Sequence, residues 1–130
     1  MPDDSKSMSA NSKKTLVLGA SANPARYSFL AINKLREHNH AVIAVGKRTA
    51  LVADVPVHDK TPQIEDLDTV SIYLNKSNQK NYYDYILSQN PKRVIFNPGA
   101  ENPEFELALS NKGIKAVEAC TLVLLATGQY

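Results

Sequence analysis

The sequence has little of what marks several protein classes. Among its 130 residues there is one cysteine, no tryptophan and only five glycines. A single thiol, Cys120, cannot form an internal disulfide, which excludes a disulfide-stapled mini-protein and fits the reducing cytoplasm. The longest apolar runs, such as Leu122–Ala126, fall far short of the ~20 residues that span a bilayer. The net charge of +2 is too small to indicate a nucleic-acid partner.

What is present fits one ordinary globular domain. Apolar residues make up 43% and charged residues 22%, close to the averages of roughly 45–50% and 25%. The first fourteen residues are polar and have no apolar central stretch, so we expect a disordered tail rather than a secretory signal. We therefore predict a tail over 1–14, one domain over 15–130, and a cytoplasmic location without a membrane partner.

From Thr15 onward, short apolar runs alternate with amphipathic segments. The runs predict strands and the amphipathic segments predict helices. Expected strands are 15–18, 41–45, 69–74, 93–96 and 115–118, with a further short edge strand possible at 55–57. Expected helices are 28–38, 77–89, 103–113 and 121–127, with Asn102 as the cap of the third.

This alternation predicts an α/β fold. The strands are continuous apolar runs, as expected of strands in a sheet that is covered on both faces. With right-handed crossovers, we predict a Rossmann-like, doubly wound, five-stranded parallel sheet with helices on both faces, in the order 3-2-1-4-5 counted along the chain. Such sheets bind ligands at the carboxyl ends of their strands, so candidate site residues are those that follow each strand.

The turn after the first strand is the most distinctive segment. Its candidate binding residues are Gly19, Ala20, Ser21, Asn23, Arg26, Tyr27 and Ser28. A dinucleotide fingerprint reads Gly-x-Gly-x-x-Gly, whereas here Ser21 and Pro24 replace the second and third glycines. Gly19 still permits a tight turn, and the N-terminus of the following helix favours anions. The segment predicts a phosphate site, with an ordinary ligand-free turn as the alternative.

Two cations follow the second strand in the segment Gly46-Lys47-Arg48. NAD enzymes usually place an acidic residue here to bind the ribose hydroxyl. Lys47 and Arg48 favour instead a ribose with an additional phosphate, as in NADP or coenzyme A (CoA). The alternative is a pair of solvated surface cations.

The Gly-x-Ser-x-x-Pro turn, the cationic loop and the segment at Cys120 resemble the family of stand-alone CoA-binding domains, which are similar to the N-terminal domain of the succinyl-CoA synthetase α subunit. The resemblance implies that CoA lies across the carboxyl edge of the sheet, with its pyrophosphate at the first turn and its adenosine near the second strand. Its pantetheine arm would then pass the third and fourth strands. The further candidate binding residues are Leu74, Asn75, Asn97, Pro98, Gly99 and Cys120.

The chain departs from the family at two places. Members often have Asn-Pro where this chain has Gly46-Lys47, and many have a proline where it has Leu74 to Ser77. The resemblance does not imply the ligase reaction, because the synthetase needs further domains.

The remaining reactive side chains give weaker signals. Cys120 is either a small buried residue or a thiol that faces pantetheine and can form a mixed disulfide with it. The three histidines, His38, His40 and His58, have no metal-site spacing, so no metal site is predicted. The tyrosines in 82–85 suggest packing on the sheet or, alternatively, a partner surface. No nucleophile–base pair is visible, so we predict no catalytic residue.

The sequence therefore favours a non-catalytic module that binds CoA or acyl-CoA as a sensor or regulator. An NADP-binding oxidoreductase or enzyme subunit is the first alternative. A ligand-free interaction protein is the second. A protein partner or a homo-oligomer stays open.

Overall fold

The structure is a computed structural model, and it describes residues 12–130. Most of the predicted tail, residues 1–11, lies outside the described residues. Residues 12–14 are attached to the domain: the backbone N–H of Lys13 donates to His40 Nδ1 at 2.9 Å, and Lys14 Nζ donates to the carbonyl of Glu65 at 2.7 Å. Within 12–130, no helix has the length and apolar character that a membrane span needs.

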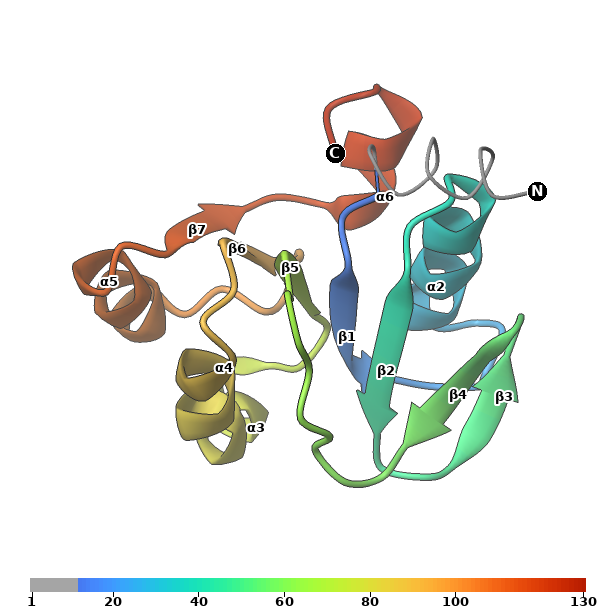
Figure 1. Cartoon of the computed structure of the whole chain (residues 1–130), viewed down its shortest axis with the longest axis horizontal. Helices are drawn as coiled ribbons and strands as arrows, with labels where there is room; N and C mark the ends of the chain where they lie inside the picture. Colours follow the sequence, from blue (N-terminus) through green and yellow to red (C-terminus); the bar gives the residue numbers. More distant parts are fainter. Residues whose placement is uncertain (1–11) are drawn as a thin grey trace.

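One seven-stranded sheet runs through the domain, with helices against it (Figure 1). The strands are β1 (Thr15–Ala20), β2 (Val42–Gly46), β3 (Ala50–Val52), β4 (Val55–His58), β5 (Thr69–Ile72), β6 (Arg93–Phe96) and β7 (Lys115–Glu118). The helices are α2 (Tyr27–Glu37), α3 (Lys76–Gln79), the 3₁₀ turn η1 (Lys80–Tyr82), α4 (Tyr83–Gln89), α5 (Pro103–Asn111) and α6 (Thr121–Ala126). Asn102 caps α5 as predicted, because its side chain accepts a hydrogen bond from the N–H of Phe105.

The predicted α/β class is confirmed, but the predicted five-stranded order is wrong. The observed order is β3-β4-β2-β1-β5-β6-β7. β3 is antiparallel to β4, and all other neighbours are parallel. The β3–β4 hairpin occupies the outer side of β2, so β5 pairs with the free side of β1 instead. The possible strand at 55–57 is β4, whereas β3, the edge strand beyond it, was missed.

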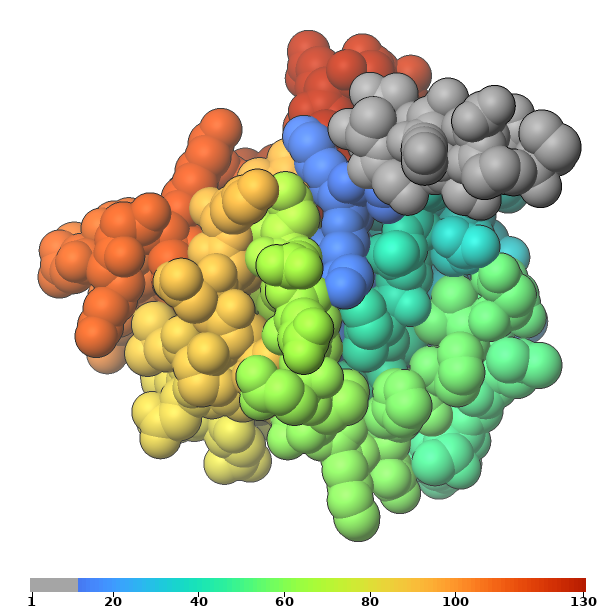
Figure 2. All heavy atoms as spheres, in the orientation of Figure 1, coloured from blue at the N-terminus to red at the C-terminus, as the bar shows by residue number. Residues whose placement is uncertain are grey.

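No helix connects β4 to β5. The connecting segment 59–68 instead buries Ile64 and Leu67 in the core, and the N–H of Ile64 donates to Gln89 Oε1 of α4 at 2.8 Å. Figure 2 shows this segment, in light green, on the face toward the viewer. This connection and α2, which connects β1 to β2, lie on opposite faces of the sheet. The strands β2 and β5 pair with β1 on its two sides, so the order of the strands reverses at β1. Ligands of doubly wound sheets bind at such a reversal point.

Two apolar layers cover the sheet, as predicted for helices on both faces. Alternate side chains of β1 point to opposite sides. Leu16 and Leu18 belong to the cluster that includes Ile86 of α4 and Phe105 of α5. Val17 belongs to the cluster formed with α2 and α6. Apolar packing on both faces of the sheet therefore holds the ends of the strands in place.

Tyr130 ties the last segment to the amino ends of the strands. It is buried, and its carbonyl accepts from Lys13 Nζ at 2.7 Å and Arg93 Nη1 at 2.8 Å. Its ring lies 4.9 Å from that of His40. These contacts are at the end of the sheet opposite the reversal point, so they stabilise the scaffold without entering the site described next.

We expect stability to fall when the pH drops below about 6.5. Burial, followed by the neighbouring positive charges, lowers the pKa of His40 from its ordinary value of 6.5. In the interval between the lowered and the ordinary pKa, the unfolded chain binds more protons than the folded one. Stability due to neutral His40 is therefore complete above the ordinary pKa and is lost as the pH falls through it.

The measurement is the melting temperature between pH 7.5 and 5.5 for the native protein and for His40→Asn, whose Oδ1 can accept the Lys13 hydrogen bond without titrating. The variant should lose less stability on acidification than the native protein. The exposed His58→Gln serves as the matched control, because His58 is not among the groups that lower the pKa of His40, and it should behave like the native protein. Equal acid sensitivity of the native protein and His40→Asn would contradict the assignment.

Candidate functional site

An open cleft of about 1040 Å³ lies at the carboxyl ends of the parallel strands. The loops after β1, β2, β5 and β6 all contribute to it. Its lining consists of Gly19, Ala20, Ser21, Ala22, Asn23, Ala25, Arg26, Tyr27, Ser28, Gly46, Lys47, Arg48, Thr49, Ala50, Tyr73, Leu74, Asn75, Asn78, Asn81, Tyr82, Pro98, Gly99 and Ala100. Its volume is at or slightly above the ~300–1,000 Å³ typical of small-molecule sites.

Two glycines allow the strand ends at the cleft to approach closely. Gly19 has φ +85°, and a Cβ there would lie 2.9 Å from the carbonyl oxygen of Tyr73. A Cβ on Gly46 would overlap the carbonyl oxygen of Ala20. The β1–β2 register shifts between Leu18 and Ala20, next to this contact. A Cβ at position 19 or 46 would collide with backbone atoms, so both positions require glycine if the floor of the cleft is to keep its shape.

The loop after β1 is organised by its own side chains. Ser21 Oγ accepts from the N–H of Asn23 at 3.0 Å, and Asn23 Oδ1 accepts from the N–H of Ala25 at 3.0 Å. The loop then enters α2, which has no side-chain cap and no acid in its first turn. Tyr27 and Ser28, the first residues of α2, line the cleft. The N-terminal end of an uncapped helix favours a negatively charged ligand.

The cleft is positively charged. Arg26, Lys47 and Arg48 line it, and none of the lining residues is Asp or Glu. The ion pairs formed within residues 12–130 do not involve these three cations. Glu101, which lies outside the lining, accepts from the N–H of Gly99 at 3.0 Å at the rim. The charge distribution therefore suits an anion near the β1 and β2 loops.

The opposite wall comes from the loops after β5 and β6. Sequence reasoning named Leu74, Asn75, Pro98 and Gly99 there, but it missed Tyr73, Asn78, Asn81, Tyr82 and Ala100. The segment predicted as one helix over 77–89 is divided into α3, η1 and α4. This division brings part of η1 to the cleft, which the helical pattern did not reveal. Burial raises the pKa of Tyr73 to about 12, so its hydroxyl stays neutral.

Of the predicted site residues, Asn97 and Cys120 do not line the cleft. Asn97 is buried, and its amide donates to Ser71 Oγ and to the carbonyl of Ile72, both at 2.9 Å. Its Oδ1 accepts from the N–H of Thr121 at 2.8 Å. The Asn97 side chain therefore connects β5 and β6 to the start of α6 rather than facing a ligand. Cys120 is half-buried, at the position before α6.

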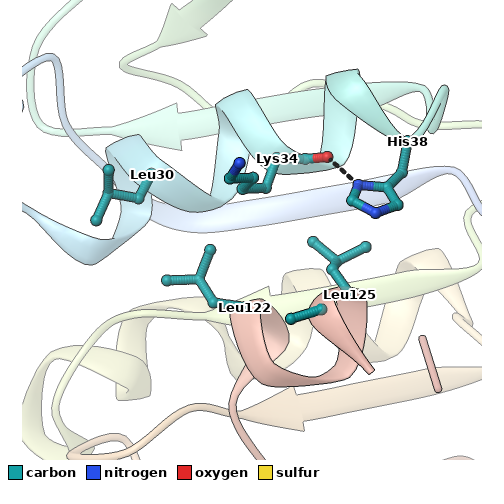
Figure 3. Close-up of a pocket in the computed structure, with 6 residues that line it drawn as sticks. Leu30, Lys34, His38, Leu122 and Leu125 are labelled. Carbon is teal, nitrogen blue, oxygen red and sulfur yellow. Dashed lines mark hydrogen bonds between the residues drawn. The ribbon is translucent and has the colours of Figure 1, made fainter. Parts of the chain in front are cut away.

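A second, smaller hollow of about 360 Å³ lies between α2 and α6 (Figure 3). Leu30, Leu122 and Leu125 provide most of its apolar lining, and His38 Nδ1 donates to the carbonyl of Lys34 at 2.8 Å within the wall. It lacks the converging polar groups of the larger cleft. The carboxyl-edge cleft is therefore the candidate functional site.

The side chains in the lining are of kinds that can bind an anionic ligand. Among residues 12–130, no three His, Cys, Asp or Glu side chains are grouped so as to hold a metal ion. The lining offers three cations, backbone N–H groups, several amides and two tyrosines in addition to Tyr27. These groups suit an extended ligand that is anionic at one end and less polar at the other.

Comparisons with known proteins agree with this description. The model of the family described as "CoA binding domain" matches residues 13–126. A crystal structure of an uncharacterized protein is 48% identical, with a TM-score of 0.89, covering 92% of this chain and 98% of that one. A structure from Thermus thermophilus is 21% identical, with a TM-score of 0.80, covering 100% and 99% of the two chains. A hypothetical protein from Pyrococcus horikoshii OT3 is 20% identical, with a TM-score of 0.78, covering 95% and 88%. The structures from Thermus thermophilus and Pyrococcus horikoshii OT3 support the fold alone. The search of curated proteins gives no match.

Proposed function

The chain belongs to the CoA-binding domain family, and from this premise we propose that it binds CoA or an acyl-CoA in the carboxyl-edge cleft. The observation that carries the proposal is that three cations and the uncapped end of α2 converge on a cleft whose lining has no acid. A ligand with several phosphate charges is complementary to such a cleft.

The cleft supports a specific orientation of the ligand. The pyrophosphate lies against the loop from Gly19 to Ser28, beside Arg26 and the uncapped N-terminal end of α2. The phosphate on the ribose lies near Lys47 and Arg48. The pantetheine arm then follows the uncharged wall formed by the loops after β5 and β6. We propose a non-catalytic role, as a sensor or regulatory module, because the cations, amides and helix end at the cleft are groups that hold an anionic ligand in place.

The ribose phosphate gives the sharpest test. CoA differs from dephospho-CoA only in the 3′-phosphate on the ribose. A hydrogen bond to a charged group contributes about 1.5–3 kcal/mol, so the protein should prefer CoA by about tenfold to a hundredfold at low salt. Calorimetry with the two ligands measures this preference. Lys47→Ala with Arg48→Ala should remove most of it and leave dephospho-CoA binding nearly unchanged.

The matched control is Lys112→Ala with Lys115→Ala, which removes the same charge from exposed positions outside the cleft. This control should keep the full preference for CoA. Equal affinity of the native protein for CoA and dephospho-CoA would overturn the assignment of the cationic loop. Tighter binding of NADP than of CoA would redirect the proposal to the NADP-binding alternative.

A further inference from the structure

A buried amide joins the two loops that form the uncharged wall of the cleft. Gln79, the last residue of α3, is 1% exposed. Its Nε2 donates to the carbonyl of Leu74 at 2.9 Å and to the carbonyl of Ala100 at 2.7 Å. Leu74 follows β5 and Ala100 follows β6, and both line the cleft. The Gln79 side chain therefore fixes the spacing between these two loops, which lie beyond the last paired residues of β5 and β6.

Gln79 is itself held in place by a second buried amide. Its Oε1 accepts from Asn102 Nδ2 at 2.9 Å, and the same Nδ2 donates to the hydroxyl of Tyr83 at 2.6 Å. Asn102 also caps α5. The two N–H donors and the oxygen of the Gln79 amide are therefore all used, and its orientation is determined by the carbonyls of the two loops and by Asn102. Buried networks with every group paired are rigid.

The two loops joined by Gln79 lie on the side opposite the cations. Arg26, Lys47 and Arg48 belong to the loops after β1 and β2, which Gln79 does not contact through any hydrogen bond within residues 12–130. A change at Gln79 should therefore act mainly on the half of the cleft formed by the loops after β5 and β6.

We propose that Gln79 is a positioning residue for ligand specificity: it sets the width of the wall that receives the uncharged arm of the ligand. This inference rests on the proposed function. It assigns recognition of the arm to a side chain that does not itself touch the ligand. It also predicts that the two halves of the ligand depend on different residues.

The experiment compares two probes, CoA and adenosine 3′-phosphate 5′-diphosphate, which is the nucleotide part of CoA without pantetheine. Gln79→Met preserves length and removes both donors. Loss of these hydrogen bonds should weaken CoA about tenfold and change the affinity for the nucleotide less than about twofold. Gln79→Glu is the second variant: at this buried position its carboxyl is neutral, so it keeps an acceptor for Asn102 and one donor in place of two. It should show a smaller loss with the same selectivity for CoA over the nucleotide.

Tyr83→Phe is the matched control, since it removes one hydrogen bond of the network without breaking the connection between the loops. It should leave both affinities unchanged. Should both Gln79 variants lose the two ligands equally, or lose neither, Gln79 is only a structural residue and the inference is overturned. Failure of the native protein to bind either probe would instead overturn the proposed function.

Discussion

Replacing Ser21 by Glu is expected to reduce CoA affinity by about a hundredfold or more. Ser21 lines the cleft in the loop where the pyrophosphate is proposed to lie, and its hydroxyl already accepts the N–H of Asn23. A carboxylate here brings a like charge next to the phosphates. At about 4 Å and an effective dielectric constant of about 20, two unit charges repel by about 4 kcal/mol, and each ~1.4 kcal/mol is tenfold in affinity.

Isothermal calorimetry with CoA measures this effect. Ser21→Gln is the matched control, because it has the size of Glu without the charge, and it should lose much less affinity than Ser21→Glu. The melting temperature of both variants should stay near that of the native protein, since the position is only half-buried. Nearly equal affinity of the Glu and Gln variants would exclude this loop from the phosphate site.

Replacing Gly46 by Ala should destabilise the domain by about 3 kcal/mol or more. The added Cβ would overlap the carbonyl oxygen of Ala20 and lie 3.3 Å from Val57 Cγ1. Both neighbours belong to strands of the same sheet, so the chains would have to separate where β1 and β2 end. Overpacking a rigid interior typically costs about 1–3 kcal/mol, and here the obstacle is backbone rather than a movable side chain.

The expected result is a fall in the melting temperature of more than about 10 °C, together with a lower urea midpoint. Gly113→Ala is the control: Gly113 has a positive φ, at +79°, whereas Gly46 does not, and no atom lies within 4 Å of the Cβ added at Gly113. That change should cost only the strain of the left-handed conformation, roughly 1 kcal/mol. If the two variants are equally stable, the close approach at Gly46 is not the constraint inferred from the structure.

The sequence predicted the kind of sheet better than its order. Continuous apolar runs identified β1, β2, β5 and β6, and the short Ala-Val pair between Lys115 and Glu118 identified β7. The order depended on the hairpin at 50–58, where Ala50–Val52 is too short and too polar in its flanks to be recognised. Once β4 occupies the outer side of β2, the next long strand has only β1 left to pair with. Pairing of this kind is decided by tertiary packing and leaves no local signal.

The candidate site was predictable to the extent that it follows strand ends. Gly19, Ser21 and the cations after β2 were named on that rule, and the structure brings them into one cleft. Asn97 obeys the same rule but is turned inward by partners on β5 and α6 that the sequence could not place. Tyr82 was read as part of a continuous helix, and only the break at η1 brings it to the cleft.

The distribution of charge in the cleft has a consequence for the rate at which a ligand is captured. With a net charge of +2, the molecule as a whole exerts only a weak long-range electrostatic attraction on an anion. Arg26, Lys47 and Arg48 nevertheless concentrate positive potential at the cleft. Such focusing accelerates the encounter with a multiply charged anion. Dissolved salt shortens the reach of this potential to about 8 Å at physiological strength. For the proposed ligand, capture therefore slows as the salt concentration rises, whereas residence depends both on the direct contacts of Lys47 and Arg48 and on the uncharged wall.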